Sequence, residues 1–469
     1  MKKYNLKYIG GLLLLCLSIC SCSDFLETYP ANSLVSNQAI ENEEDIQTAL
    51  RGAYQGLLSE AYYGCDFVVQ GDVQGDDVQP ISQGVRTENL YRFTARQNNA
   101  PTGLWSRPYL VINRVNVILN AIETKDFPAT ATLNDAKGQA LALRALCHFN
   151  LLITYGYPYL KDQGASLGVS LVKEVLPATA LPERSSVAEG YDMVIKDLTD
   201  ALAVIGSAEK DGHFNKWAVE ALLARVNLYK GDWKQAFDYA DDVIQNSPYD
   251  LIPNAQYVNA WKDEYTSESI FDVHSSGLSA GNRELLGYVA HPTGYAALIA
   301  TKDFIDLLNE DPQDVRLGLL QTDSENQKRF INKYPGRNGS VAVNNMRVLR
   351  LSDIYLIGAE AALKKPQPDQ TKADEYLNAI IQRANPAAVH VTATEELVLK
   401  ERRKELVMEG HRFFDAMRLG KAITRSGGFH FLNNVDLINP TWSDFRCVKP
   451  IPQAEIDVNH NIEQNPDYN

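Results

Sequence analysis

The chain has 469 residues, of which 45 are lysine or arginine and 59 are aspartate or glutamate, so its formal net charge is −14. An acidic surface repels nucleic acid and anionic lipid headgroups, and neither is therefore expected as a partner. A hydrophobic content of 45% with 22% charged residues is ordinary for a globular protein, and the length would accommodate several domains or one large helical body.

The chain begins with a segment that is typical of secretory signals. Three lysines precede an apolar run at residues 9–19, which is too short to span a bilayer but suits the hydrophobic region of a signal. Ser21 is the small residue that cleavage requires before Cys22, and the sequence around it resembles the box of bacterial lipoproteins. We therefore expect residues 1–21 to be removed and Cys22 to carry acyl chains that hold the protein on a membrane. The alternative is an ordinary cleaved signal followed by an incidental cysteine.

The remaining cysteines do not indicate a disulfide framework. Beyond the predicted signal and Cys22, only Cys65, Cys147 and Cys447 are left, and they are odd in number and far apart. Cys147 lies among apolar residues in "LALRALCHFNLL", so we expect it to be a small buried hydrophobe.

Helical periodicity dominates the first half of the mature chain. Residues 109–124 and 133–155 are predicted helices, and the second should end at Gly156. Ser186 and Glu189 form a capping box, which predicts a helix directly after it. An earlier helix, beginning near residue 43, should present one apolar face made of Ile46, Leu50, Ala53, Tyr54 and Leu57.

A pair of short helices is predicted after that, with Asn215 capping the first helix and Gly231 separating the two. Ala224 and Ala236 stand twelve residues apart, and small residues at such positions let paired helices approach closely, as in tetratricopeptide repeats. The same spacing recurs in a later helical pair. We therefore predict an all-α fold with a tetratricopeptide-like helical-pair scaffold, whose pairs lie near residues 109–155, 186–246 and 349–384.

Two stretches, residues 60–107 and 249–346, do not follow the helical pattern. The first is polar and rich in turn residues, and the second contains a predicted strand, "SIFDVHS", followed by glycine-rich loops. We expect one body over residues 22–469, with these stretches as loop-rich insertions and an irregular second half that carries a few short strands. Loops on a rigid scaffold are where binding usually resides.

Sequence motifs for metal or cofactor binding are missing. No histidine or cysteine spacing of a zinc site and no phosphate-binding loop occurs. The acidic cluster Asp72, Asp76 and Asp77 lacks the Asp-x-Asp-x-Asp-Gly run of a calcium loop. We therefore predict no cofactor and no metal.

One motif indicates a different function, that of a serine hydrolase. Residues 277–281, "GLSAG", match the Gly-x-Ser-x-Gly of a nucleophile elbow and follow the predicted strand. That elbow belongs to a wound parallel sheet, and no strand–helix alternation surrounds this segment. We interpret it as a loop, which leaves a serine hydrolase as the less favoured alternative.

A second segment, "ERRKELVMEGHR" at residues 401–412, carries charges at helical spacing. Its glutamates Glu401, Glu405 and Glu409, with Arg412, could suggest acid–base catalysis. We interpret them instead as an ion-pair ladder that locks this helix to its neighbours.

The same segment resembles the most specific signature of the SusD/RagB family of outer-membrane lipoproteins. Further similarities to the family occur in its order along the chain, at residues 22–30, 109–116, 138–145, 155–158, 197–198, 223–225 and 450–466. The resemblance implies about four tetratricopeptide-like pairs and an irregular second half. It also implies a non-enzymatic protein that binds glycans at the cell surface and acts as a hinged lid on a SusC-like TonB-dependent barrel transporter.

The leading hypothesis is therefore a lipid-anchored glycan-capture protein, and a tetratricopeptide-type protein-interaction adaptor is the alternative. Sugar C–H faces pack on aromatic rings, and hydroxyls hydrogen-bond with polar side chains. Trp105 is expected to be an exposed stacking residue before a helix that opens near Pro108. Four arginines could favour an anionic glycan: Arg86, Arg92, Arg96 and Arg107. The expected glycan-binding residues, each of which could instead pack in the core, are Tyr62, Tyr63, Asp76, Asp77, Trp105, Arg107, Tyr288 and Tyr295.

Overall fold

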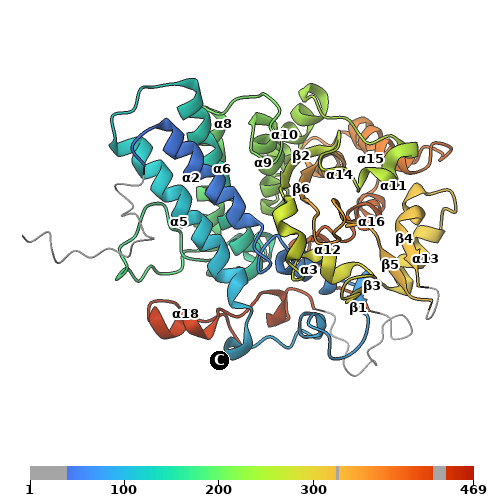
Figure 1. Ribbon diagram of the computed structural model, residues 1–469. Coiled ribbons are helices and arrows are strands. Elements are labelled where there is room, and N and C mark those ends of the chain that lie inside the picture. Colours follow the sequence, from blue (N-terminus) through green and yellow to red (C-terminus); the bar gives the residue numbers. More distant parts are fainter. Residues whose placement is uncertain (1–39, 324–326, 426–439, 469) are drawn as a thin grey trace, which may run out of the picture.

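The structure, a computed structural model, describes residues 40–323, 327–425 and 440–468. The predicted signal and Cys22 lie outside these residues. Figure 1 shows long N-terminal helices side by side on the left and a less regular half, with short strands and helices, on the right.

Long helices pack against one another in chain order and form the scaffold. α2 packs on α5, α5 on α6, α6 on α8, α8 on α9 and α9 on α10. The stack then continues from α10 to α14 and α15, although about a hundred residues separate α10 from α14 in sequence. The predicted helical-pair fold is confirmed. The bounds are α2 (Glu43–Leu57), α5 (Thr102–Thr124), α6 (Ala131–Tyr155), α8 (Val187–Leu202), α9 (Lys216–Lys230), α10 (Trp233–Asn246), α14 (Leu351–Lys364) and α15 (Gln370–Ala384).

Local sequence signals explain where these helices begin and end. The Asn215 side chain accepts a hydrogen bond from the backbone N–H of Ala218, and Ser186 and Glu189 cap α8 reciprocally, as predicted. Gly231 ends α9 in the left-handed conformation, with φ of +82°. The predicted apolar face of α2 is also confirmed, because its buried residues are Ile46, Leu50, Ala53, Tyr54 and Leu57.

Small side chains let the paired helices approach closely. Ala224 on α9 and Ala236 on α10 are both fully buried. Ala361 and Ala373, at the same spacing on α14 and α15, are buried to the same extent. A larger side chain at any of these positions would separate the two helices of its pair.

The remaining described residues form short elements around this stack. Among them, the strands occur as three antiparallel pairs, β1–β3, β2–β6 and β4–β5, and the predicted strand "SIFDVHS" is confirmed as β2. The strands are β1 (Val78–Pro80), β2 (Ser269–Val273), β3 (Leu298–Ala300), β4 (Leu320–Thr322), β5 (Arg329–Ile331) and β6 (Met346–Arg350). The helices are α3 (Asp66–Val73), α4 (Glu88–Tyr91), α7 (Tyr159–Asp162), α11 (Tyr257–Ala260), α12 (Leu286–Ala290), α13 (Lys302–Asn309), α16 (Glu395–Leu406), α17 (Arg412–Arg418) and α18 (Gln453–Val458).

Residues 60–107 are more ordered than their polar sequence predicts. They include α3, whose residues from Phe67 to Val73 are all buried, and the first turns of α5. α3 packs against α17 so closely that a Cβ at Gly71 would lie 2.0 Å from the carbonyl oxygen of Gly410. Burial against distant segments therefore determines the structure here. Within the described ranges, no helix is both long enough and apolar enough to cross a membrane.

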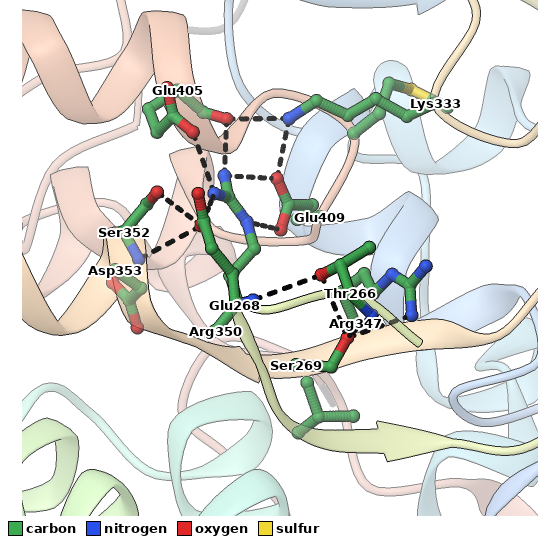
Figure 2. Close-up of polar contacts among 12 residues, drawn as sticks. Thr266, Glu268, Ser269, Lys333, Arg347, Arg350, Ser352, Asp353, Glu405 and Glu409 are labelled. Carbon is green, nitrogen blue, oxygen red and sulfur yellow. Dashed lines mark hydrogen bonds and ion pairs between the residues drawn. The ribbon is translucent and has the colours of Figure 1, made fainter. Parts of the chain in front are cut away.

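A network of buried charges joins the irregular half to the scaffold (Figure 2). Arg350, at the end of β6, lies between Glu405 and Glu409 and donates to Glu405 at 2.7 Å and to Glu409 at 2.6 Å. Lys333 donates to Glu409 at 2.6 Å, and Arg350 also donates to Glu268 at 3.1 Å. Side chains from four separate parts of the chain therefore meet in one buried region.

Glu405 is the most heavily engaged carboxylate of this network. Besides Arg350, it accepts hydrogen bonds from Arg316 at 3.0 Å and from the Tyr257 hydroxyl at 3.0 Å, and it forms an ion pair with Arg383 at 2.5 Å. Its side chain is fully buried. Burial alone would raise the pKa of Glu405, but the surrounding arginines outweigh burial and hold this pKa well below its usual range.

The ion pairs differ from the predicted ladder along a single helix. α16 ends at Leu406, and the chain then turns through Met408 and Gly410, which have φ of +63° and +83°. Glu409 therefore lies beyond α16, and Arg412 begins α17. The charges do lock this segment to its neighbours, but most of their partners come from other elements because the side chains point into the core.

We expect Glu405→Gln to lower the free energy of unfolding by about 3–5 kcal/mol at pH 7, because it leaves buried arginines without a compensating carboxylate. The depressed pKa means that Glu405 contributes stability above the unfolded-state value near 4.5 and loses this contribution as pH falls through its lower folded-state value. The difference in the free energy of unfolding between Glu405→Gln and the parent chain should therefore shrink below about pH 4.5. Urea unfolding at several pH values measures this. Glu396→Gln, at an exposed position of α16, is the control, and equal midpoints for the two variants would refute the role of Glu405.

Candidate functional site

Five of the eight predicted glycan-binding residues lie in the core. Tyr62 and Tyr63 are 0% and 5% exposed, and their hydroxyls accept hydrogen bonds from the Asn150 side chain at 2.6 and 2.9 Å. Their rings pack on each other and on Phe67. The prediction that these two tyrosines contact a glycan is wrong, because neither offers a free ring face.

Trp105 is also buried, contrary to the prediction. α5 begins at Thr102 rather than near Pro108, so Trp105 lies inside the first turns of the helix. Its ring is 4% exposed and packs edge-to-face on Tyr155 with centroids 4.9 Å apart. Arg107 is exposed on the same helix.

Asp76 and Asp77 hold the scaffold together rather than facing solvent. The Arg412 side chain donates to Asp76 at 2.8 Å, and Arg403 donates to Asp77 at 3.1 Å. The backbone carbonyls of both aspartates accept hydrogen bonds from Thr301, which directly follows β3. The predicted glycan contact is therefore wrong for both residues, and their carboxylates form an ionic joint between the segment before β1 and the 401–412 signature.

The neighbouring Asp72 is equally enclosed. It accepts the backbone N–H groups of Met408 and Gly410 at 3.0 and 2.6 Å, and burial raises its pKa to about 8. Within the described part of the chain, no group of three or more histidine, cysteine or acidic side chains is arranged to hold a metal ion.

Tyr288 and Tyr295, in contrast, come together at the surface. Their rings form an edge-to-face pair with centroids 5.0 Å apart, and Tyr295 is 42% exposed. Arg86 lies over the Tyr295 ring at 4.9 Å, and Arg283 lies over the Tyr288 ring at 5.6 Å. With Glu284, these four residues form what we call the tyrosine platform.

A tight turn brings the two tyrosines together. The backbone N–H of Tyr295 donates to the carbonyl of Tyr288 at 2.8 Å, closing the loop that follows α12. Gly294 is required in this turn, because a Cβ there would lie 2.0 Å from the Tyr288 carbonyl oxygen. Ala296 has a φ of +51°, and the chain then enters β3, which pairs with β1. The platform is therefore fixed at one end by a strand pair.

The charges of the platform are nearly balanced. Arg86 forms an ion pair with Glu284, and the hydroxyl of Tyr295 donates to Glu284 at 3.3 Å. The second arginine, Arg283, is exposed. Asp66, which interacts electrostatically with Arg86, adds a further negative charge near the platform. Burial raises the pKa of Asp66 to about 6, although Arg86 opposes this shift, so Asp66 is largely ionised at neutral pH. Polar groups of both signs thus surround two aromatic rings.

Sequence reasoning identified the two tyrosines but missed Arg283 and Glu284. The available signal was their position directly before an aromatic segment in a glycine-rich loop. No local sequence pattern could have predicted the ion pair of Glu284 with Arg86, because the two residues are 198 positions apart in the sequence.

The "GLSAG" segment does not form a nucleophile elbow. It is a 3₁₀ turn, Gly277–Gly281, whose start is capped by the Ser276 side chain. The preceding strand β2 belongs to a two-stranded antiparallel pair rather than a parallel sheet. The geometry that exposes a catalytic serine above such a sheet is therefore not built here.

A stack of helical pairs that carries irregular loops defines a helical-repeat scaffold protein. Comparison with known sequences places this scaffold in a family. A family model described as "SusD family" matches residues 321–468, and one described as "Starch-binding associating with outer membrane" matches residues 24–228.

Solved structures agree with this placement. A SusD superfamily protein from Bacteroides vulgatus is 35% identical with a TM-score of 0.86, covering 92% of this chain and 100% of that one. Another from Bacteroides thetaiotaomicron is 36% identical with a TM-score of 0.85, covering 91% and 100%. The SusD-like protein P38 of Formosa agariphila is 24% identical over 527 residues, 98% of this chain and 100% of the relative. The chain belongs to the SusD family.

The burial of Trp105 leads to a stability prediction. Trp105→Ala removes a large ring from a packed site and should lower the free energy of unfolding by about 3–5 kcal/mol. Arg107→Ala, two residues further along α5 and exposed, should change it by less than about 0.5 kcal/mol. Denaturant unfolding of the two variants measures the difference. An unfolding midpoint of Trp105→Ala equal to that of the parent chain would show that the ring is not part of the core.

Proposed function

We propose that this protein captures oligosaccharides or polysaccharides at the cell surface through the tyrosine platform and delivers them to a SusC-like TonB-dependent transporter. The observation that carries the proposal is the exposed ring of Tyr295, packed on the half-buried Tyr288 and flanked by charges, in a chain of the SusD family. The description of one matching family model, with starch binding and outer-membrane association, supports both the ligand class and the location.

The chemistry of the platform suits a sugar. The face of an exposed tyrosine packs against the C–H groups of a pyranose ring, and the two rings at a steep angle, 81°, offer surfaces in two directions. Arg86 and Glu284 can donate to and accept from sugar hydroxyls next to the ring they flank. Their mutual ion pair holds these groups in place before a ligand arrives, which lowers the entropic cost of binding.

We propose a neutral glycan rather than an anionic one. The four arginines that could have formed a basic patch are dispersed. Arg86 pairs with Glu284, Arg92 pairs with Glu88, and Arg96 lies over the ring of Phe445. Arg107 stands on α5. Glu284 and the nearby Asp66 together offset Arg86 and Arg283, so the platform lacks the excess of positive charge that would favour a uronic or sulfated polysaccharide.

Binding without catalysis is the function that we propose. Glu401, Glu405 and Glu409 are buried and engaged by basic side chains, so they are inaccessible to a polysaccharide. The "GLSAG" turn offers no support for a hydrolase, as described above. A protein-interaction adaptor would not need an exposed tyrosine that is bordered by groups suited to hydroxyls.

Tyr295→Ala tests the platform. A glycan array identifies a ligand of the parent chain, and isothermal titration then measures its affinity. The variant should bind this ligand at least tenfold more weakly, about 1.4 kcal/mol, with a nearly unchanged melting temperature because the ring is exposed. Leu278→Ala removes another exposed apolar side chain, 98% exposed in the "GLSAG" turn, and should bind normally. Unaltered affinity of the Tyr295 variant would refute the proposed glycan site.

The lipid anchor is a separate part of the proposal. If acylated Cys22 alone holds the protein on the outer membrane, then Cys22→Ala should release it into the soluble fraction while the fold is retained. Fractionation after a salt wash, with circular dichroism of the released chain, measures both properties. Retention of the variant on washed membranes would exclude acylated Cys22 as the only anchor.

A further inference from the structure

A pocket of about 350 Å³ lies beside α2 and shares no lining residue with the tyrosine platform. Its walls come from α2, from the loop between α8 and α9, and from the ends of β2. The side chains that matter for its chemistry are Arg51, Tyr54, Gln55, His213, Tyr265 and His274. We call it the α2 pocket. Its volume is within the roughly 300–1,000 Å³ range of small-ligand sites.

Two aromatic pairs line the α2 pocket. The ring of His213 packs edge-to-face on Tyr54 with centroids 4.6 Å apart, and Tyr54 is itself held by hydrogen bonds to Phe214 and Gln139 at 2.9 and 2.8 Å. On the other side, His274 and Tyr265 are nearly parallel, with an angle of 13° and centroids 6.2 Å apart. Both walls therefore offer flat aromatic surfaces.

The loop that closes the α2 pocket requires a glycine. Gly212 has a φ of +67°, and a Cβ at this position would lie 2.9 Å from the Tyr265 hydroxyl. The loop between α8 and α9 therefore approaches the Tyr265 wall as closely as the backbone allows. The α2 pocket is concave because this loop packs closely against Tyr265.

Polar groups with free hydrogen-bonding capacity complete the α2 pocket. The Nδ1 atom of His213 is 2.7 Å from the backbone carbonyl of Asp211, so Nδ1 carries the proton and donates. Burial lowers the pKa of His213, and nearby cations including Lys210 add to this effect, so the ring is neutral and its Nε2 is an acceptor. Gln55 and Arg51 are exposed at the rim and supply donors.

We infer that the α2 pocket is a second carbohydrate site, separate from the tyrosine platform, that takes one or two neutral sugar rings. Flat aromatic walls suit C–H faces, and an unprotonated imidazole nitrogen beside amide and guanidinium donors suits hydroxyl groups. The charge of Arg51 is offset by Asp211, which also lines the pocket, and this balance disfavours a charged ligand. The inference rests on the proposed function for its ligand class, but not on the platform as the place of binding.

A substitution that fills the α2 pocket from its rim tests the inference without removing core contacts. Gln55→Trp places a large ring at an exposed position of α2. Glu44→Trp is the matched control, because it adds the same ring to an exposed position about 16 Å away on the same helix. The full chain is purified in a detergent without a sugar headgroup. Isothermal titration then uses maltohexaose, laminarihexaose, cellohexaose and mannohexaose as probes, with Tyr295→Ala as a third variant.

We expect at least one of these probes to occupy a site that persists in Tyr295→Ala and is weakened at least tenfold in Gln55→Trp, with Glu44→Trp like the parent chain. Loss of binding in Gln55→Trp with full binding in Tyr295→Ala would support the α2 pocket and refute the platform. Parent-like binding of every probe by Gln55→Trp would overturn the inference. A parent chain that binds none of the four probes would overturn the assignment of the α2 pocket to neutral sugars.

Discussion

The ion pairs of Glu405 with Arg350, Arg383 and Arg316 are the interaction on which the irregular half of this protein depends. Arg350 lies in β6, Arg383 in α15 and Arg316 in the segment before β4. One carboxylate therefore joins three different elements of the chain. Loss of one partner in such a buried pair costs about 3–5 kcal/mol, which is a large fraction of the roughly 5–15 kcal/mol that stabilises a typical folded protein. These charged groups are enclosed in the core and form ion pairs with one another.

The network also determines where the tyrosine platform lies. The signature that contributes Glu405 continues to Arg412, and Arg403 and Arg412 hold Asp77 and Asp76 before β1. β1 pairs with β3, which directly follows the turn that carries Tyr295. The tyrosine platform is therefore connected to the core through an ionic joint and a strand pair. This arrangement leaves the proposed glycan site little freedom to rearrange, which would favour a ligand with a defined shape.

Local patterns predicted the scaffold well because its helices depend on local signals. The apolar face of α2, the cap at Asn215 and the turn at Gly231 all follow from spacing and residue type. Burial in the 60–107 segment could not be predicted, because it depends on partners far away in sequence. Asp76 meets Arg412 across 336 positions, and Tyr62 meets Asn150 across 88, so residues that look like exposed loop residues belong to the core. Tyr288 and Tyr295 were predictable as a pair because they are only seven positions apart, with a glycine turn between them.

We propose that a glycan binds on the tyrosine platform, with the exposed ring of Tyr295 as its main contact. The most direct measurement is a crystal structure of this chain with the oligosaccharide that it binds best on a glycan array. We expect a sugar ring packed on the face of Tyr295, with its hydroxyls hydrogen-bonded to Arg86 or Glu284. The arrangement of Tyr288 and Tyr295 should be unchanged from the free protein. A bound oligosaccharide that leaves both tyrosines uncovered would contradict it.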